Sequence, residues 1–459
     1  MKSRTSFFNI TLFKKDITRF APLWVLYTVA MSLMMLTTYT TLGNYFSPVR
    51  ELGRSIGGYS VINLLYGVLV AQLLFGDLFN SRLCNALHAM PMTREVRFGS
   101  HITAGLAFSI IPNLIISLLI SPSFGQYWYL PLIWLGSMTL QYVLFFGAGV
   151  LAALCTGNRF AMTVVYAIIN FCSLMVYWFV ETVYLPMMPG VILDTDIFRL
   201  FSPVVQMCSV SNYFLTTQKT ALYMQPQYRF DGLGEGWWYL LICAGVGIVL
   251  LGSALLLYRK RALESAGDFI AVSWLRPVFL VLYTLCAGAF VAIFGDLFST
   301  GTYVIFLIVG LIVGFFTGKM LLARTTRVFS KKSFIHLAVM TAAILLSVGA
   351  VKYDLLGVIR YVPRPEAVET VTVEYRYGDL QKLELENIEE IDRVCNVHRL
   401  LLEQSCEGIL VSNHAHINVT ITYQLRSGQT VERRYWLCQT GDAYFALQTL
   451  CSQKIHATK

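Results

Sequence analysis

The sequence carries little charge for its length. Charged residues make up 13% of the 459 residues and hydrophobic residues 56%, whereas soluble domains carry about 25% and about 45–50% respectively. The stretches from Ile102 to Asn158 and from Phe160 to Val180 contain no charged residue at all. Uncharged runs of this length exclude a single soluble domain, and they predict a polytopic membrane protein.

The shortage of charge is confined to residues 1–353, which hold 24 basic and 12 acidic residues. Residues 354–459 hold 14 acidic and 11 basic residues, a density that is normal for a soluble domain. The basic excess of the first part indicates membrane topology and contact with anionic lipid headgroups. It does not indicate nucleic-acid binding.

The sequence also lacks a nucleotide-hydrolysing motif. Gly314-Phe-Phe-Thr-Gly318-Lys319 superficially resembles a phosphate loop, but three residues instead of four separate its glycines, and Met320 replaces the required Ser or Thr. The segment lies in a predicted apolar helix, where no strand-to-helix turn offers free amides. Gly310, Gly314 and Gly318 recur every four residues, a spacing that favours close helix–helix packing in lipid.

Ionisable side chains are missing from the centres of the predicted spans, because Asp77, Glu181, Asp296 and Lys319 all lie at or near span ends. Ion-driven carriers and intramembrane proteases usually need such groups, so both classes are disfavoured. The cysteines show no metal-binding spacing. A disulfide is chemically possible among those of the carboxy-terminal part, Cys395, Cys406, Cys438 and Cys451. We therefore predict no catalytic residue, cofactor or metal site, and no enzyme activity.

Nine segments have the roughly 20 apolar residues needed to cross a bilayer; they are residues 20–41, 59–76, 102–121, 129–153, 161–182, 237–257, 277–295, 302–320 and 334–353. A short interfacial helix is expected before them, from Phe7 to Phe20. With a cytoplasmic amino terminus, 18 Lys and Arg residues fall on the cytoplasmic side and six on the outside. Nine spans then place residues 354–459 outside the cell.

The carboxy-terminal part reads as a small α+β domain. Residues 371–376 alternate apolar and polar side chains as a half-buried strand does, and residues 416–425 and 431–437 predict a hairpin. Residues 387–404 have helical spacing with Asn387 as N-cap, and 443–451 predict a last short helix. The predicted fold class is an all-α polytopic membrane protein with a small α+β carboxy-terminal soluble domain.

The loop from Phe79 to Arg94 is the strongest candidate for a functional element. It predicts a short amphipathic helix, a turn at Met90-Pro91-Met92 and a second helix start. Leu83, Ala86, Leu87 and Met90 would fill a groove on a cytosolic partner, between the polar contacts of Arg82 and Arg94. The alternative is an interfacial helix that rests on lipid.

At this loop the sequence resembles the permease subunits of type 2 ATP-binding-cassette (ABC) transporters, the exporter-like class. The resemblance covers about residues 7–270 and includes the helix before the first span, the loop ending Met90-Pro-Met-Thr-Arg94 and the long outer loop before the sixth span. It also includes Tyr258-Arg-Lys-Arg-Ala-Leu-Glu-Ser-Ala-Gly267-Asp268. The three further spans and the carboxy-terminal domain exceed the six-span pattern; similar extensions occur on some permeases of Gram-positive bacteria.

The resemblance implies a permease core at 1–270, three additional spans at 271–353 and an extracytoplasmic domain at 354–459. It also implies a separate ABC ATPase subunit seated on residues 79–90, and a second permease subunit in a homodimer or heterodimer. The implied function is export of a lipid, peptide or drug-like substrate across the cell membrane. Two alternatives stay open: a membrane sensor or resistance module whose outer domain binds a ligand, and a secondary carrier or lipid-modifying membrane enzyme.

Overall fold

The computed structural model describes residues 8–41, 48–89, 92–209, 214–220, 227–261, 267–296, 300–377, 379–404, 416–438, 445–446 and 449. The chain divides into two compact units. The first comprises Met1–Met175, Asp196–Tyr283 and Phe315–Val328, and the second comprises Val176–Thr195, Thr284–Gly314 and Phe329–Lys459. Helices α8, α12 and α13 contribute residues to both units.

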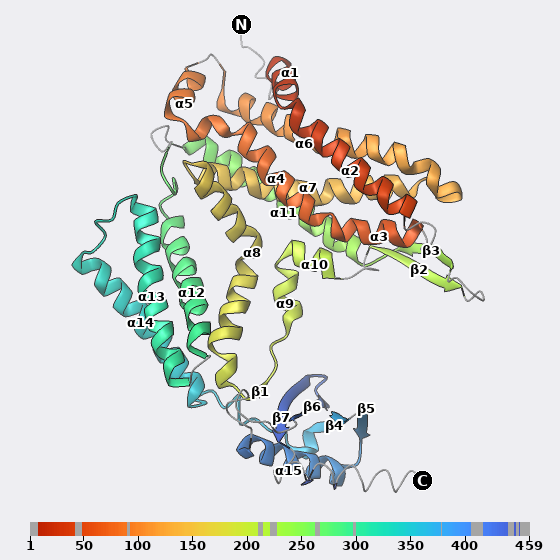
Figure 1. Ribbon diagram of the computed structural model, residues 1–459, viewed down its shortest axis with the longest axis vertical. Coiled ribbons are helices and arrows are strands. Elements are labelled where there is room, and N and C mark those ends of the chain that lie inside the picture. Colours follow the sequence, from red (N-terminus) through yellow and green to blue (C-terminus); the bar gives the residue numbers. More distant parts are fainter. Residues whose placement is uncertain are drawn as a thin grey trace. The chain divides into compact units, whose positions relative to one another are not determined.

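Helices dominate the chain (Figure 1). They are α1 (Ile10–Arg19), α2 (Ala21–Thr41), α3 (Pro48–Gly58), α4 (Ser60–Leu74), α5 (Ser81–His88), α6 (Arg94–Ile120), α7 (Leu130–Cys155), α8 (Arg159–Val183), α9 (Thr195–Leu200), α10 (Pro203–Ser209), α11 (Gly236–Lys260), α12 (Leu275–Asp296), α13 (Thr300–Ala323), α14 (Lys331–Lys352) and α15 (Ile388–Gln404). Short 3-10 turns are η1 (Gly76–Phe79), η2 (Ser121–Tyr127), η3 (Leu185–Met187) and η5 (Pro365–Ala367).

Within the described residues, eight helices are long and apolar enough to cross a membrane. A ninth candidate is the pair Ile10–Arg19 and Ala21–Thr37, which is bent by 58°. The predicted interfacial helix and first span thus form two helices with a sharp bend between them. Several long apolar helices are compatible with a multi-pass membrane protein, and that part of the prediction is confirmed.

The second span begins earlier than the sequence suggested. It runs from Glu51 to Leu74 instead of starting at residue 59. The difference arises because the charges of Glu51 and Arg54 lie within the helix, where their side chains are 3.6 Å apart one turn from each other. The Glu51 side chain is buried, so a helix start that looked polar in the sequence is packed inside the protein.

The long loop before α11 contains structure that the sequence did not reveal. Besides α9 and α10 it holds strands β2 (Leu215–Thr220) and β3 (Gln227–Leu233), which pair antiparallel as a two-stranded sheet. Leu215 is buried beside Gly53 of α3. The hairpin therefore packs on the bundle through its first strand, in a segment that was expected only to be a long outer loop.

The second unit contains a five-stranded antiparallel sheet in the order β1-β7-β6-β4-β5. Its strands are β1 (Gly190–Val191), β4 (Val368–Tyr377), β5 (Asp379–Leu385), β6 (His416–Leu425) and β7 (Thr430–Cys438). Alternate residues of β6, namely Val419, Ile421 and Tyr423, are completely buried and form a core with α15. The predicted strands, hairpin and long helix of this domain are confirmed; the predicted helix at 443–451 lies mostly outside the described residues.

Candidate functional site

Helix α5 is the element that the sequence singled out, and it lies at the end of the first unit where α7 and α11 end and α6 begins (Figure 1). Asn80 starts it: its Oδ1 accepts hydrogen bonds from the backbone N–H groups of Arg82 at 3.0 Å and Leu83 at 3.5 Å. Such side-chain acceptors satisfy amides that have no partner inside the first helical turn. The local sequence therefore specifies where this short helix begins.

The two faces of α5 differ in burial. Arg82 and Leu83 are exposed, the Leu83 side chain to 51%, whereas Cys84 is 2% exposed and belongs to the bundle core. The side chain of Leu87, although on α5, and the whole of Met90 lie outside the described residues. Ala86 is also exposed, so the described part of α5 offers an outward surface with Arg82, Leu83 and Ala86 and meets the bundle through Cys84.

Arg94, the remaining residue predicted for this loop, binds the end of another helix. Its Nη1 donates to the backbone carbonyls of Tyr258, Arg259 and Arg261, each at 3.0 Å. These carbonyls close the carboxy-terminal end of α11, where backbone acceptors have no partner within the helix and the helix dipole favours a cation. The structure therefore places Arg94 as a cap of α11.

Arg261 caps the carboxy-terminal end of α7 in the same way. Its Nη1 donates to the carbonyls of Ala153 and Leu154 at 2.8 and 2.9 Å, and its Nη2 donates to Thr156 at 2.8 Å and to Leu78 at 3.5 Å. Burial lowers the pKa of Arg261 below its ordinary value. The five donors of a planar guanidinium suit a site where several carbonyls converge.

Further contacts hold the same end together. Arg259 pairs with Glu95 at 3.2 Å. The segment after α11 runs beside the loop that follows α7: Gly157 N–H donates to the Asp268 carbonyl at 2.8 Å, and Gly267 N–H donates to the Gly157 carbonyl at 2.7 Å. The described residues of the segment that carries this part of the resemblance, 258–261 and 267–268, thus belong to the junction between α7 and α11.

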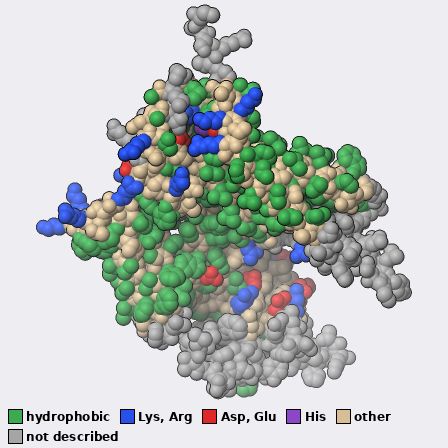
Figure 2. Space-filling view, turned by 45° about the horizontal axis from the view of Figure 1, so that its top comes forward, with side chains coloured by type: hydrophobic (Ala, Val, Ile, Leu, Met, Phe, Trp, Pro, Cys, Tyr) green, Lys and Arg blue, Asp and Glu red, His purple; other side chains and the backbone are tan. Residues whose placement is uncertain are grey.

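Helix α1 docks on α6 at this end through polar contacts. The backbone N–H of Asn9 donates to Ser100 Oγ at 2.9 Å, and His101 Nδ1 lies 2.7 Å from Asp16 Oδ2. Asp16 and His101 are both buried. Lys14, Lys15 and Arg19 point outward from α1, and Figure 2 shows Lys and Arg side chains gathered near the amino-terminal end, above a broad apolar flank.

Two sets of buried polar contacts cross the helices of the first unit, and sequence reasoning missed them. Tyr27 donates to Asn113 Oδ1 at 3.0 Å, and Asn113 Nδ2 donates to Ser109 Oγ at 3.1 Å. Asn63 Nδ2 donates to Gln141 Oε1 at 3.1 Å. The signal was present as single Asn and Gln residues in apolar runs, but the sequence does not pair residues that lie 75 or more positions apart.

The glycines predicted for helix packing lie on α13. A Cβ added at Gly310 would lie 2.9 Å from the Ala287 carbonyl oxygen of α12, and one at Gly314 would lie 2.5 Å from Ala287 Cβ. At Gly318 the nearest atom, 2.9 Å away, belongs to Tyr283. The phosphate-loop-like stretch therefore lies inside α13, with its glycines against α12.

The carboxy-terminal domain has its own buried polar cluster. His398 on α15 is completely buried, with Nδ1 3.0 Å from the Tyr423 hydroxyl and Nε2 2.7 Å from the Tyr435 hydroxyl. Gly190 of β1 has φ +78°, and a Cβ there would lie 2.2 Å from the Tyr435 ring. Only glycine therefore fits where β1 joins the sheet edge.

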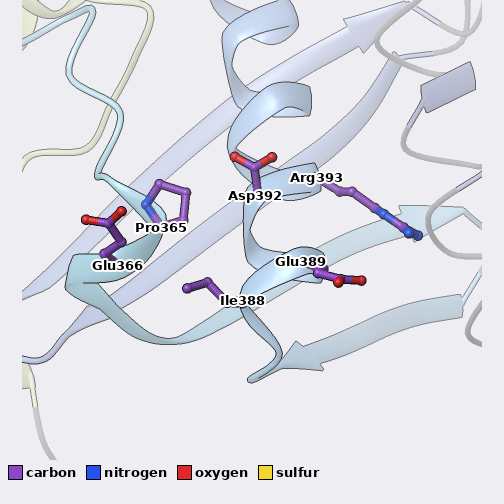
Figure 3. A pocket seen from close by; sticks show the side chains of 6 residues that line it. All are labelled: Pro365, Glu366, Ile388, Glu389, Asp392 and Arg393. Carbon is purple, nitrogen blue, oxygen red and sulfur yellow. The ribbon is translucent and has the colours of Figure 1, made fainter.

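A shallow depression of about 500 Å³ lies between η5 and the start of α15. Its lining residues are Pro365, Glu366, Ile388, Glu389, Asp392 and Arg393. Figure 3 shows the Glu389 and Arg393 side chains extending away from Glu366, so the charged groups do not converge on one point. In the part of the chain that the structure describes, no three His, Cys, Asp or Glu side chains gather as metal ligands. This depression gives no ligand assignment.

No family model, curated protein or solved structure matches the chain. The arrangement of α5, Arg94 and Arg261 is therefore interpreted from its own geometry.

Proposed function

We propose that this chain is the transmembrane permease subunit of an ATP-driven ABC transporter of the type 2, exporter-like class, which works with a separate ATPase subunit. It then lies in the cell membrane, with its amino terminus in the cytoplasm and residues 354–459 outside. The distribution of Lys and Arg, 18 against six, supports this orientation. The end of the first unit that carries α1 and α5 faces the cytoplasm in this arrangement.

The observation that carries the proposal is the two-sided character of α5. A short helix between two long apolar helices exposes Arg82 and Leu83 while Cys84 is buried in the bundle. A helix that rests on lipid would bury the same leucine in the membrane, so recovery of an ATPase with this chain separates the two interpretations. An exposed leucine beside an arginine suits an apolar groove with an acidic rim on a cytosolic partner.

The mechanism requires no bond-making chemistry in this chain. ATP binding closes the partner ATPase subunits, α5 moves with the cleft that holds it, and the helices exchange inward-facing and outward-facing states. The energy enters as the different affinity of nucleotide for these two states. The permease therefore needs a mechanical link to the ATPase and a pathway, and it needs no cofactor.

We also propose that lipid and a second permease subunit, identical or related, cover the apolar helix surfaces. Trp238, Ile242, Ile248 and Val249 of α11 are each more than 60% exposed. Side chains of this kind need lipid or another helix around them. The substrate class that fits an apolar pathway is a lipid, a peptide or an amphipathic drug-like compound.

The test is co-purification of the ATPase with two leucine variants. Leu83→Asp places a charge on the exposed face of α5, and we expect it to lose a contact worth roughly 1.5–3 kcal/mol, which lowers affinity for the ATPase about 10–100-fold. Leu356→Asp is the matched control, because Leu356 is 81% exposed and follows α14, on the side we propose to be outside. It should retain the ATPase.

Both variants should be inserted in the membrane and elute from a sizing column like the wild type. Equal recovery of the ATPase with Leu83→Asp and with the wild type would contradict the role of α5. Loss of the ATPase from the Leu356→Asp variant would also contradict it, because the proposed contact does not include that residue.

A further inference from the structure

The carboxy-terminal ends of α7 and α11 are joined by arginines that each come from a different segment. A helix end leaves its last carbonyls without partners inside the helix. At α7 these acceptors are bound by Arg261, which follows α11, and at α11 they are bound by Arg94, which begins α6. The Arg261 carbonyl is itself one of the Arg94 acceptors, at 3.0 Å. The two caps therefore form one connected unit.

The same arginine reaches the segment that carries α5. Arg261 Nη2 lies 3.5 Å from the carbonyl oxygen of Leu78, a buried residue of η1 directly before α5. On the inner face of α5, burial raises the pKa of the Cys84 thiol, and the positive charge of Arg261 opposes that rise. Arg261 is thus adjacent to the base of α5 and to the end of α7 at once.

Helices α7 and α11 are well suited to move together. A Cβ added at Gly147 would lie 2.6 Å from the Gly247 carbonyl oxygen, and one at Gly247 would lie 2.6 Å from the Val143 carbonyl oxygen. Backbones this close leave no room for one helix to shift without the other. A displacement that reaches the end of α7 is therefore passed to α11 as well.

We infer that Arg261 is a positioning residue that transmits a displacement of η1 and α5 to the paired helices α7 and α11. The inference rests on the proposed function, because the ATPase supplies the displacement. A rigid guanidinium with several carbonyl partners passes on a movement that a flexible lysine ammonium does not, since the ammonium has three donors on a mobile stem. A cap without this role would stabilise α7 but leave the response to nucleotide unchanged.

The experiment compares Arg261→Lys with Arg259→Lys in the permease–ATPase complex, reconstituted in lipid nanodiscs. Both changes keep the positive charge. Arg259 is exposed and its side chain pairs with Glu95 at 3.2 Å, so its variant is the matched control. Backbone hydrogen exchange is measured by mass spectrometry without nucleotide and with ATP plus vanadate, in peptides that cover 76–88 and 152–157.

In the wild type and in Arg259→Lys, we expect nucleotide to change exchange in both peptides. In Arg261→Lys the response of 76–88 should persist while the response of 152–157 is lost, with the ATPase still bound. A response at 152–157 in Arg261→Lys equal to that of the wild type would overturn the inference.

Two further outcomes separate the inference from its premise. If the Arg261→Lys variant does not fold, the inference is tested on the wild type alone. A change of hydrogen exchange on nucleotide binding at 76–88, without any change at 152–157, overturns the inference and leaves the proposed function intact. Absence of an ATPase from the wild-type preparation overturns the proposed function, and the inference falls with it.

Discussion

Acidification is expected to destabilise the carboxy-terminal domain, because its core buries a histidine. His398 lies between the hydroxyls of Tyr423 on β6 and Tyr435 on β7. Burial, together with the charges of Arg433 and Arg399, lowers its pKa from 6.5 to about 4. The neutral ring donates from one nitrogen and accepts at the other, and both hydroxyls can complement it. The folded domain therefore keeps His398 neutral at pH values well above its pKa of about 4.

Stability falls on acidification because the unfolded chain binds a proton at His398 at a higher pH than the folded domain does. Between pH 6.5 and about pH 4 the unfolded chain carries a protonated His398 and the folded domain does not, so stability falls as pH falls. With these two pKa values the free energy of unfolding drops by about 2 kcal/mol between pH 7 and pH 5, and by about 3 kcal/mol at pH 4. The contribution is fully present above the unfolded pKa and is lost on acidification.

The measurement is hydrogen exchange of the slowest amides of β6 and β7 in the full chain in detergent, corrected for the pH dependence of intrinsic exchange. His398→Gln is the reference, because glutamine keeps a donor and an acceptor but does not titrate. The wild type should lose about 2 kcal/mol more than this variant between pH 7 and pH 5. Equal losses in the two proteins would refute the reasoning.

Three substitutions of glycine test the packing. Gly247→Val should lower the thermal midpoint in detergent by overpacking worth roughly 1–3 kcal/mol, whereas Gly245→Val, where a Cβ meets nothing within 4 Å, should cost less. Gly314→Val should separate α13 from α12 and lower the thermal midpoint similarly. Its control is Gly349→Val, where an added Cβ meets nothing within 4 Å. Equal midpoints for a variant and its control, in either pair, would contradict the prediction. Gly190→Ala should strain the backbone at φ +78° and displace β1 from the sheet, which faster hydrogen exchange at β7 would reveal and unchanged exchange would disprove.

The long helices could be predicted because a membrane span is encoded locally, in about 20 consecutive apolar residues. The same holds for the helix at 387–404, where Asn387 Oδ1 accepts the Glu389 N–H at 3.3 Å as an N-cap residue does. Strand β1 could not be predicted in this way. Its two residues, Gly190 and Val191, pair with Arg434 and Arg433, more than 240 positions later. No local pattern in the sequence marks such a pairing.

The candidate site also has a part that local sequence predicts and a part that depends on contacts between distant residues. The exposed face of α5 could be read from the sequence, because Arg82 and Leu83 follow a helix-starting Asn80 within one turn. The roles of Arg94 and Arg261 could not, since both residues carry the same basic signal as any membrane anchor. What distinguishes them is the convergence of carbonyls from helix ends more than 100 positions away, and only the three-dimensional packing brings these together.

The most direct test of the proposed function is purification of the tagged wild-type chain from its native membranes, followed by quantitative mass spectrometry of its partners. The proposal predicts a stoichiometric ATPase subunit with a phosphate-loop motif, released when Leu83→Asp replaces the wild type. A chain that purifies reproducibly without any ATPase, under detergent conditions that keep known ABC transporter complexes intact, would contradict the proposal.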